Sequence, residues 1–195
     1  MQAARGASLS PQGDAEHITP SGHRLRRYRL LFAGVAVVAY ALDQITKALA
    51  AAHLTPGEPK DLVGSLLRLD LTRNAGAAFS TGTSHTEIFT ALAIVAVVVV
   101  LWFAARTRSV FWTVALGLLL AGIIGNLTDR IFREPQGMRG HVVDFLELPH
   151  WPIFNVADMC INVAAVLIVI QVYRGVRVGG DHSRPAHEGP REPSA

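Results

Sequence analysis

The chain has 195 residues, of which half are hydrophobic and only 17% are charged, and its mean hydropathy is +0.32. A soluble domain carries about 25% charged residues, so the composition argues against a soluble protein and indicates a membrane protein. The small formal net charge of +3 gives no reason to expect a nucleic-acid partner.

Four apolar stretches are long enough to cross the hydrocarbon core of a bilayer as helices. They cover residues 30–52, 88–105, 110–127 and 153–173. We therefore predict an all-α membrane protein with four transmembrane helices in a domain of residues 24–175. The flanking tails, 1–23 and 176–195, are rich in polar residues, Gly and Pro, and we expect them to be disordered because they cannot bury enough apolar surface.

The first apolar stretch carries an acidic and a basic residue, Asp43 and Lys47, four positions apart. That spacing places both on one helix face, where they form either a structural ion pair or a contact that shapes a site. The basic residues before this stretch and its Ala39-Tyr40-Ala41 segment also resemble a cleavable signal peptide. The charged pair and the apolar continuation to residue 52 favour a retained helix.

The loops predict the orientation, because Lys and Arg are enriched in cytoplasmic loops. If both tails and the 106–108 turn share one side, that side holds Arg5, Arg24, Arg26, Arg27, Arg29, Arg106, Arg108, Arg174, Arg177, Arg184 and Arg191. The opposite side holds only Lys60, Arg68, Arg73, Arg130, Arg133 and Arg139. We therefore expect both termini to be cytoplasmic.

The outward segment between the first two helices contains a short β-element. Residues 65–72 partly alternate apolar and polar side chains, the period of a half-buried strand, so we expect a strand or hairpin on the membrane surface. Asn74 and Gly76 follow among small residues, where backbone can approach a ligand closely; a plain turn is the alternative.

The third apolar stretch ends in polar residues at the predicted outer boundary. Gly122 and Gly125 permit close helix packing, and Asn126, Asp129 and Arg130 follow at spacings that share a helix face. Alternatives are that Arg130 extends toward lipid headgroups and that Asn126 simply joins two helices.

Two aspartates flank the start of the last apolar stretch, Asp144 and Asp158. Ionisable groups at such a boundary are costly and often functional, and two adjacent carboxyl groups share one proton. Such a pair can activate water for attack on an amide. Three alternatives remain: a zinc site including His141, a nucleophilic Cys160, and a proton-coupled transporter.

Five short blocks in this order resemble the lipoprotein signal peptidases (signal peptidase II), bacterial membrane aspartyl peptidases. The blocks are Asp43-Gln44-Ile45-Thr46-Lys47, Asn74-Ala75-Gly76-Ala77-Ala78-Phe79, Gly125-Asn126-Leu127-Thr128-Asp129-Arg130, Val142-Val143-Asp144-Phe145 and Phe154-Asn155-Val156-Ala157-Asp158. Ala121 stands where that family usually has a second Gly, which affects helix packing only.

The resemblance implies an enzyme that removes the signal peptide from diacylglyceryl-modified prolipoproteins, cutting on the N-terminal side of the lipidated cysteine. By position, Asp144 and Asp158 correspond to the catalytic pair. The residues expected to support them or bind substrate are Asn74, Gly76, Asn126, Asp129, Arg130, Asn155, Asp43 and Lys47.

No cofactor is implied, and we expect a monomer in the bacterial inner membrane, with lipid around it and the active site near its outer face. Substrate would reach the site sideways from the bilayer. Which aspartate is the base is open.

Overall fold

The structure is a computed structural model that describes residues 22–76 and 86–179. Its elements in chain order are α1 (Gly22–His53), β1 (Lys60–Val63), β2 (Leu67–Asn74), α2 (Thr86–Ala104), α3 (Val110–Phe132), β3 (Val142–Glu147) and α4 (Val156–Tyr173). Most of both predicted tails lies outside the described residues, as do Ala77, Ala78 and Phe79 of the second sequence block.

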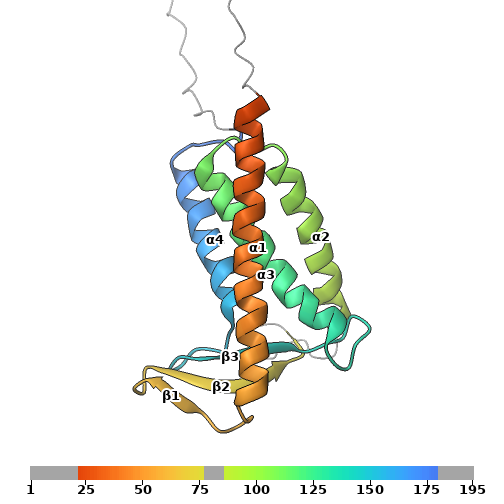
Figure 1. The fold of residues 1–195 in the computed structure, drawn as a ribbon, viewed down its shortest axis with the longest axis vertical. Helices are drawn as coiled ribbons and strands as arrows, with labels where there is room; N and C mark the ends of the chain where they lie inside the picture. The colour runs from red at the N-terminus through yellow and green to blue at the C-terminus, as the bar shows by residue number, and fades with distance from the viewer. Residues whose placement is uncertain (1–21, 77–85, 180–195) are drawn as a thin grey trace, which may run out of the picture.

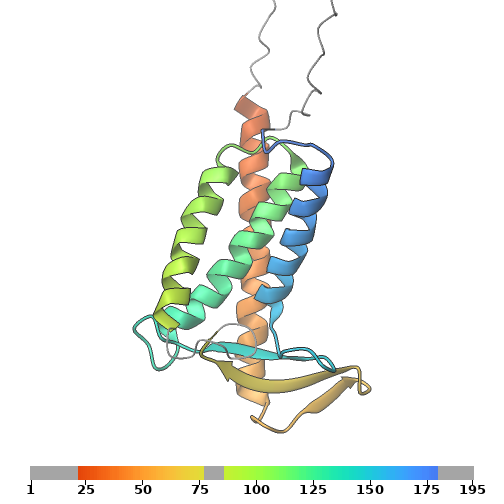
Figure 2. The same ribbon diagram turned by 180° about the vertical axis from the view of Figure 1, so that it is seen from behind.

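The four helices are all long and apolar enough to cross a membrane, as predicted. Helix α3 is the central one and packs against α1, α2 and α4; Figure 2 shows it crossing between α2 and α4. Half of its apolar window is buried, against 17% or less in the other three. The other helices therefore present most of their apolar side chains to lipid.

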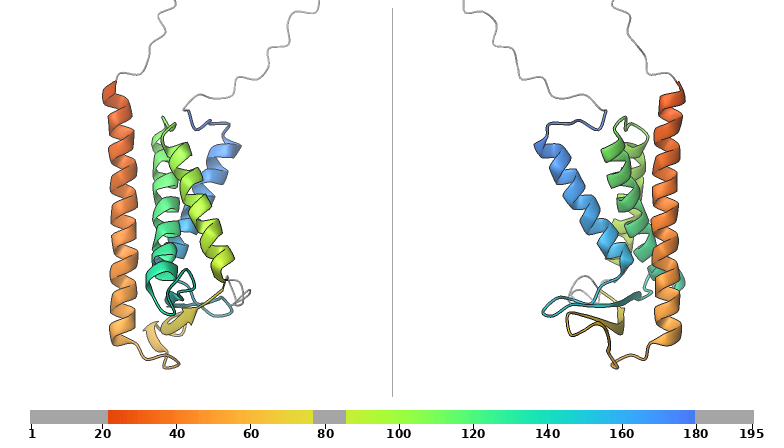
Figure 3. Two further views of the ribbon diagram at one scale, coloured as in Figure 1. Left: turned by 90° about the vertical axis from the view of Figure 1, so that its right-hand side faces the viewer. Right: turned by 60° about the vertical axis from the view of Figure 1, so that its left-hand side comes forward.

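Helix α1 is longer than its apolar stretch. It begins at Gly22, so the basic residues Arg24, Arg26, Arg27 and Arg29 form its first turns and are exposed. At 1.5 Å per residue its 32 residues span about 48 Å, more than the roughly 30 Å of hydrocarbon. Figure 3 shows α1 along one side of the other three helices and reaching beyond them.

A three-stranded antiparallel sheet lies across one end of the bundle, with strand order β1-β2-β3 (Figure 1). The predicted β-element between the first two helices is confirmed as β1 and β2. No sequence pattern predicted β3, which comes from the segment between α3 and α4 and pairs with β2 so that Asp144 lies opposite Thr72. One of the two candidate aspartates is thus on a strand, and the other is on a helix.

The sheet is fixed to the bundle by a small apolar cluster. Ala50 near the end of α1 packs with Leu71 of β2 and with Val143 and Phe145 of β3. Two further clusters join α3 to its neighbours, one of them around Ala39, Ala121 and Cys160 and the other around Val100, Leu116 and Leu120. These contacts hold the sheet at the bundle end where the polar candidate residues lie.

At the opposite end, the chain after α4 folds back onto the turn between α2 and α3. Trp112 Nε1 donates to the carbonyl of Val176 (2.9 Å), and the backbone N–H of Arg108 donates to the carbonyl of Val178 (3.0 Å). Ordered contacts thus continue for a few residues past position 175, where we expected the C-terminal tail to begin.

Candidate active site

Asp158 is positioned by the start of α4. Asn155 is the N-cap: its Oδ1 accepts the backbone N–H of Asp158 (3.0 Å), and Asp158 Oδ2 accepts the backbone N–H of Asn155 (3.2 Å). This reciprocal capping box satisfies two backbone donors that a helix start leaves free. It also directs the Asp158 carboxylate back toward the N-cap.

Asp144 is positioned by β3. Residues 142–145 are all buried, and Asp144 itself is 2% exposed. Its two carboxylate oxygens each accept one amide: Asn155 Nδ2 donates to Oδ1 (2.6 Å), and Asn74 Nδ2 donates to Oδ2 (3.1 Å). The side chain is therefore held from both sides.

Asn155 contacts both aspartates and so brings them to one place. It caps α4 through Asp158, and its amide nitrogen donates to Asp144. Asn126 completes the arrangement, because its Nδ2 donates to Asp158 Oδ1 (2.8 Å). Each of the four carboxylate oxygens of the pair has an N–H donor, which suits carboxyl groups that must keep one orientation.

The environment of Asp144 favours its protonated form. Burial raises the pKa of Asp144, and the nearby negative charge of Asp158 raises it further, to about 7; the amides of Asn74 and Asn155 and the charge of Lys47 act in the opposite direction. A partly desolvated carboxyl group next to another acid does not ionise readily. The pair can therefore hold one proton near neutral pH.

Asn74 is oriented by the bend that follows β2. Its Oδ1 accepts the backbone N–H of Gly76 (3.0 Å), which leaves Nδ2 free to face Asp144. Arg130 holds the same bend from α3, with its NH2 group donating to the carbonyl of Gly76 (2.7 Å). Thr86 Oγ1 donates to the carbonyl of Ala75 (2.6 Å).

Arg130 is only 8% exposed and points into the protein. The alternative that it extends toward lipid headgroups is therefore wrong. Hydrogen bonds to backbone carbonyls compensate the guanidinium of Arg130 for the hydration that it loses on burial.

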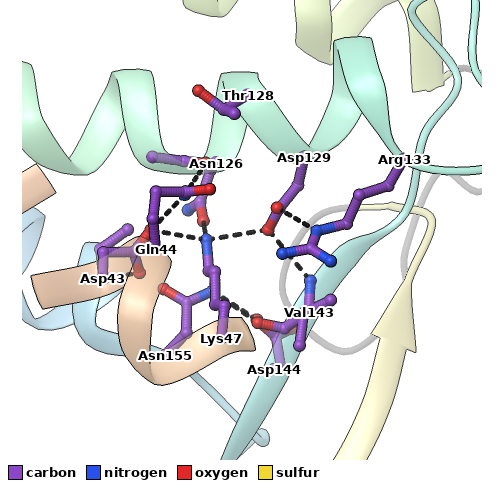
Figure 4. A network of polar contacts seen from close by, with 12 residues as sticks. Asp43, Gln44, Lys47, Asn126, Thr128, Asp129, Arg133, Val143, Asp144 and Asn155 are labelled. Atoms are coloured by element: carbon purple, nitrogen blue, oxygen red, sulfur yellow. Dashed lines mark hydrogen bonds and ion pairs between the residues drawn. The ribbon is translucent and has the colours of Figure 1, made fainter. Parts of the chain in front are cut away.

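The remaining supporting residues gather around Lys47, whose Nζ donates to Asn126 Oδ1 (2.9 Å). The two residues that share a face of α1 form an ion pair: Lys47 Nζ lies 3.0 Å from Asp43 Oδ2, and both residues are buried. Asp129, also buried, pairs with Lys47 and with Arg133. Figure 4 shows Lys47 between Asn126 and Asp129.

Arg133, Gln44 and Thr86 also support the site and were not predicted. Arg133 pairs with Asp129 four residues earlier, a spacing that would have indicated it. Gln44 donates to Asp43 Oδ2 (3.0 Å) and to the carbonyl of Gly125 (3.3 Å); its neighbour Asp43 was the only signal.

The alternative chemical groups occupy other surroundings. Cys160 is buried in the apolar cluster with Ala39 and Ala121, as expected of a packing residue. Within residues 22–76 and 86–179, no three His, Cys, Asp or Glu side chains gather closely enough to hold a metal ion.

Comparison with known proteins identifies the family. A bacterial membrane enzyme solved by the in meso method superposes with a TM-score of 0.68 over 87% of this chain and 95% of that chain, at 25% identity. The lipoprotein signal peptidase of Mycobacterium avium (strain 104) is 44% identical over 160 residues, 82% of this chain and 87% of that protein. The lipoprotein signal peptidase of Mycobacterium tuberculosis (strain ATCC 25618 / H37Rv) is 46% identical over 145 residues, 74% of this chain and 71% of that protein.

The family model described as signal peptidase (SPase) II matches residues 35–174. This range is more than half of the chain and contains every residue of the candidate site. The chain therefore belongs to the signal peptidase II family.

Proposed function

We propose that this chain is a membrane-embedded aspartyl endopeptidase that removes the signal peptide from diacylglyceryl-modified prolipoproteins, cutting on the N-terminal side of the lipidated cysteine. Membership of the family supports cleavage of lipoprotein signal peptides. The aspartyl chemistry is our inference from the site. We place the peptidase domain at residues 24–175, with the tails outside it.

One observation carries the aspartyl mechanism: a single residue, Asn155, contacts both acids. Its side-chain amide donates to Asp144 while it forms the capping box with Asp158. Two carboxyl groups that share a partner cannot both ionise cheaply in a buried site. The arrangement suits a pair that works with one proton between its members.

The chemistry requires one charged and one protonated carboxyl group. The charged one accepts a proton from a water molecule as that water attacks the scissile carbonyl carbon, and the protonated one donates to the developing oxyanion or to the leaving nitrogen. The pKa of Asp144, raised to about 7, suits a group that holds the proton in the resting enzyme. Water attack by this route needs no metal and no covalent intermediate.

The position of the pair suits a substrate anchored in lipid. Asp158 lies in the first turn of α4 and Asp144 in the sheet across the end of the bundle. A signal helix beside the bundle would keep its apolar residues and acyl chains in the bilayer, with only the scissile bond at this depth. Substrate would thus arrive sideways, and the sheet would limit access of bulk water.

Among the described residues, the buried charged side chains are Asp43, Lys47, Asp129, Arg130 and Asp144. All of them lie at the sheet end of the bundle. A proton-coupled transporter would need ionisable groups along a path across the membrane, so this distribution favours the peptidase. We further propose that both termini are cytoplasmic and that the site faces outward.

The test is cleavage of a lipidated and an unlipidated lipobox substrate by the purified protein. The proposal requires cleavage of the lipidated substrate, and Asp144→Asn and Asp158→Asn should each abolish it while the protein stays folded. Asp70→Asn is the matched control, since Asp70 is an aspartate of β2 outside the site. Full activity in either site variant would refute the aspartate pair, and activity lost to a chelator and restored by zinc would favour a metallopeptidase.

A further inference from the structure

Lys47 is a fully enclosed charged group, with 0% of its side chain exposed, and so is its partner Asp129. A lysine ammonium has three N–H donors, and each has an acceptor here: Asp43 Oδ2 at 3.0 Å, Asp129 Oδ2 at 2.9 Å and Asn126 Oδ1 at 2.9 Å. Figure 4 shows the ammonium among these groups. Because it is fully enclosed, Lys47 cannot touch substrate.

The first acid paired with Lys47 also holds α4. Asp43 Oδ1 accepts the backbone N–H of Ala157 (2.8 Å), the residue directly before Asp158. This N–H belongs to the first turn of α4 and has no acceptor within its own helix. Asp43 therefore ties the backbone that carries Asp158 to α1.

The second acid paired with Lys47 holds β3 in the same manner. Asp129 Oδ2 accepts the backbone N–H of Val143 (3.2 Å), the residue directly before Asp144. Asp129 therefore ties the backbone that carries Asp144 to α3. One ammonium thus sits between two carboxylates, each of which holds the residue preceding one member of the aspartate pair.

We propose that Lys47, with Asp43 and Asp129, is a positioning group that sets the separation of the two aspartate-bearing segments, β3 and the first turn of α4. The inference rests on the proposed function and adds how that site is assembled. Attraction of both carboxylates to one cation fixes the distance between their two backbone partners. The third donor extends this control to a side chain, because Lys47 holds Asn126 Oδ1 and so leaves Asn126 Nδ2 facing Asp158.

The first variant is Lys47→Met, which keeps an unbranched apolar chain and removes the charge. We expect kcat to fall about 100-fold, as for a small misplacement of reacting groups. KM should change by about twofold or less, because Lys47 makes no substrate contact. Lys60→Met is the matched control, since Lys60 is exposed on β1 and its loss should leave kcat unchanged.

Two triple variants keep the test decisive if Lys47→Met does not fold. Lys47→Met/Asp43→Asn/Asp129→Asn removes all three charges but retains an oxygen acceptor for each backbone N–H, whereas Lys47→Met/Asp43→Ala/Asp129→Ala removes the acceptors too. We expect the kcat of the Asn triple to exceed that of the Ala triple by about tenfold, because the Asn side chains keep acceptors for the Val143 and Ala157 N–H groups that position the two aspartates. Equal kcat values in the two triples would overturn the proposal.

Backbone amide exchange provides a readout that does not depend on activity. Exchange at Val143 and Ala157 should become faster in Lys47→Met and in the Ala triple, while exchange at Phe154, which donates to the carbonyl of Leu146 (2.9 Å), should not change. Unchanged exchange at Val143 and Ala157 would overturn the proposal even if activity were lost. Faster exchange together with wild-type kcat would also overturn the positioning role of Lys47. The proposed role of Asp144 and Asp158 would not be affected by that result, because it is tested by the Asp144→Asn and Asp158→Asn variants.

Discussion

Asn155 has two structural roles, and a suitable substitution can remove one while keeping the other. As N-cap it stabilises α4, and as amide donor it holds Asp144. Serine also serves as an N-cap, but its short hydroxyl cannot reproduce the amide donor to Asp144.

We therefore expect Asn155→Ser to lose activity by at least about tenfold while its stability falls by less than about 1 kcal/mol, whereas Asn155→Ala should lose both activity and about 1 kcal/mol of stability. The measurements are thermal unfolding in detergent and kcat on a lipidated substrate. Full activity in Asn155→Ser would show that the amide donor to Asp144 is dispensable.

The raised pKa of Asp144, about 7, predicts the pH dependence of the enzyme. In the proposed mechanism the pair works with one proton, and the free enzyme would lose that proton as pH rises through this value. Because kcat/KM reports ionisations of the free enzyme, we expect kcat/KM to fall above about pH 7. A kcat/KM that stays constant to pH 9 would contradict an Asp144 proton in the mechanism.

The same shift predicts a pH-dependent stability. The pKa of Asp144 is raised in the folded protein from 3.8 to about 7, so the stability associated with its protonated form is fully present below pH 4 and is lost as pH rises to 7. The difference corresponds to about 4 kcal/mol. The Asp144→Asn side chain cannot ionise, so the unfolding temperature of this variant should rise relative to that of the wild type between pH 4 and 7, and the difference should be constant above pH 7. A difference that is the same at pH 4 and pH 7 would contradict the raised pKa of Asp144.

Sequence reasoning located most polar site residues but not the direction of their side chains. Arg130 illustrates the limit: its depth near the membrane boundary followed from its place at the end of an apolar run, and extension toward lipid was a reasonable alternative. Its actual partners, the carbonyls of Ala75 and Gly76, lie more than fifty positions away in the chain. Such long-range contacts depend on tertiary packing, which no local pattern encodes.

At the scale of elements, α3 owes its central place to two glycines. A Cβ on Gly122 would lie 2.5 Å from the carbonyl oxygen of Ala157, and one on Gly125 would lie 2.5 Å from Asp43 Oδ2. Gly122 therefore allows α4 to pack closely against α3. Gly125 leaves space for Asp43 of α1, which accepts a backbone N–H of α4. This is the close packing expected of small residues between membrane helices.

These distances predict different results for three alanine variants. Gly122→Ala should destabilise the α3–α4 contact, because backbone and Ile161 lie in the way. Gly125→Ala should displace Asp43 and lower kcat more than it lowers the unfolding temperature. Gly34→Ala is the control, since nothing lies within 4 Å of its added methyl and alanine favours a helix by about 1 kcal/mol. A Gly125→Ala enzyme with wild-type kcat would contradict the role of this glycine.

The helices followed from hydropathy because crossing lipid requires a long apolar segment whose backbone bonds to itself. Strand β3 had no such signature. Its residues are Val142–Glu147, and the first four are buried without alternation, so neither a period of two nor a long apolar run marks them. Its partner β2 lies across two helices in sequence, and strand pairing at that distance depends on context more than on propensity.

The capping box of α4 was, by contrast, readable in principle. Asn155 precedes Asp158 by three residues just before an apolar run, which is the arrangement of an N-terminal helix signal. That signal places the helix start at Asn155, whereas hydropathy alone placed it at residue 153. What it could not show is that the cap also reaches Asp144 on another element.

At the scale of the whole molecule, polarity is sharply divided between the two ends of the bundle. The sheet end holds the buried charged network, whereas the other end holds the exposed arginines at the start of α1 and on the α2–α3 turn. Figure 1 shows the start of α1 and the end of α4 at the end opposite the sheet. Since Lys and Arg favour the cytoplasmic side, this division predicts that the sheet faces outward.

The orientation can be tested with single cysteines in a Cys160→Ala background, since Cys160 is the only cysteine of the chain. Trp151 is 62% exposed in the loop before α4, and Arg106 is exposed on the α2–α3 turn. In intact cells a membrane-impermeant thiol reagent should label Trp151→Cys, and it should label Arg106→Cys only after permeabilisation. Both variants should retain cleavage activity, so that labelling reports the working enzyme. The reverse pattern would put the aspartate pair on the cytoplasmic side. The cleavage site of a translocated prolipoprotein would then lie at the opposite, outer face of the membrane, out of reach of the pair.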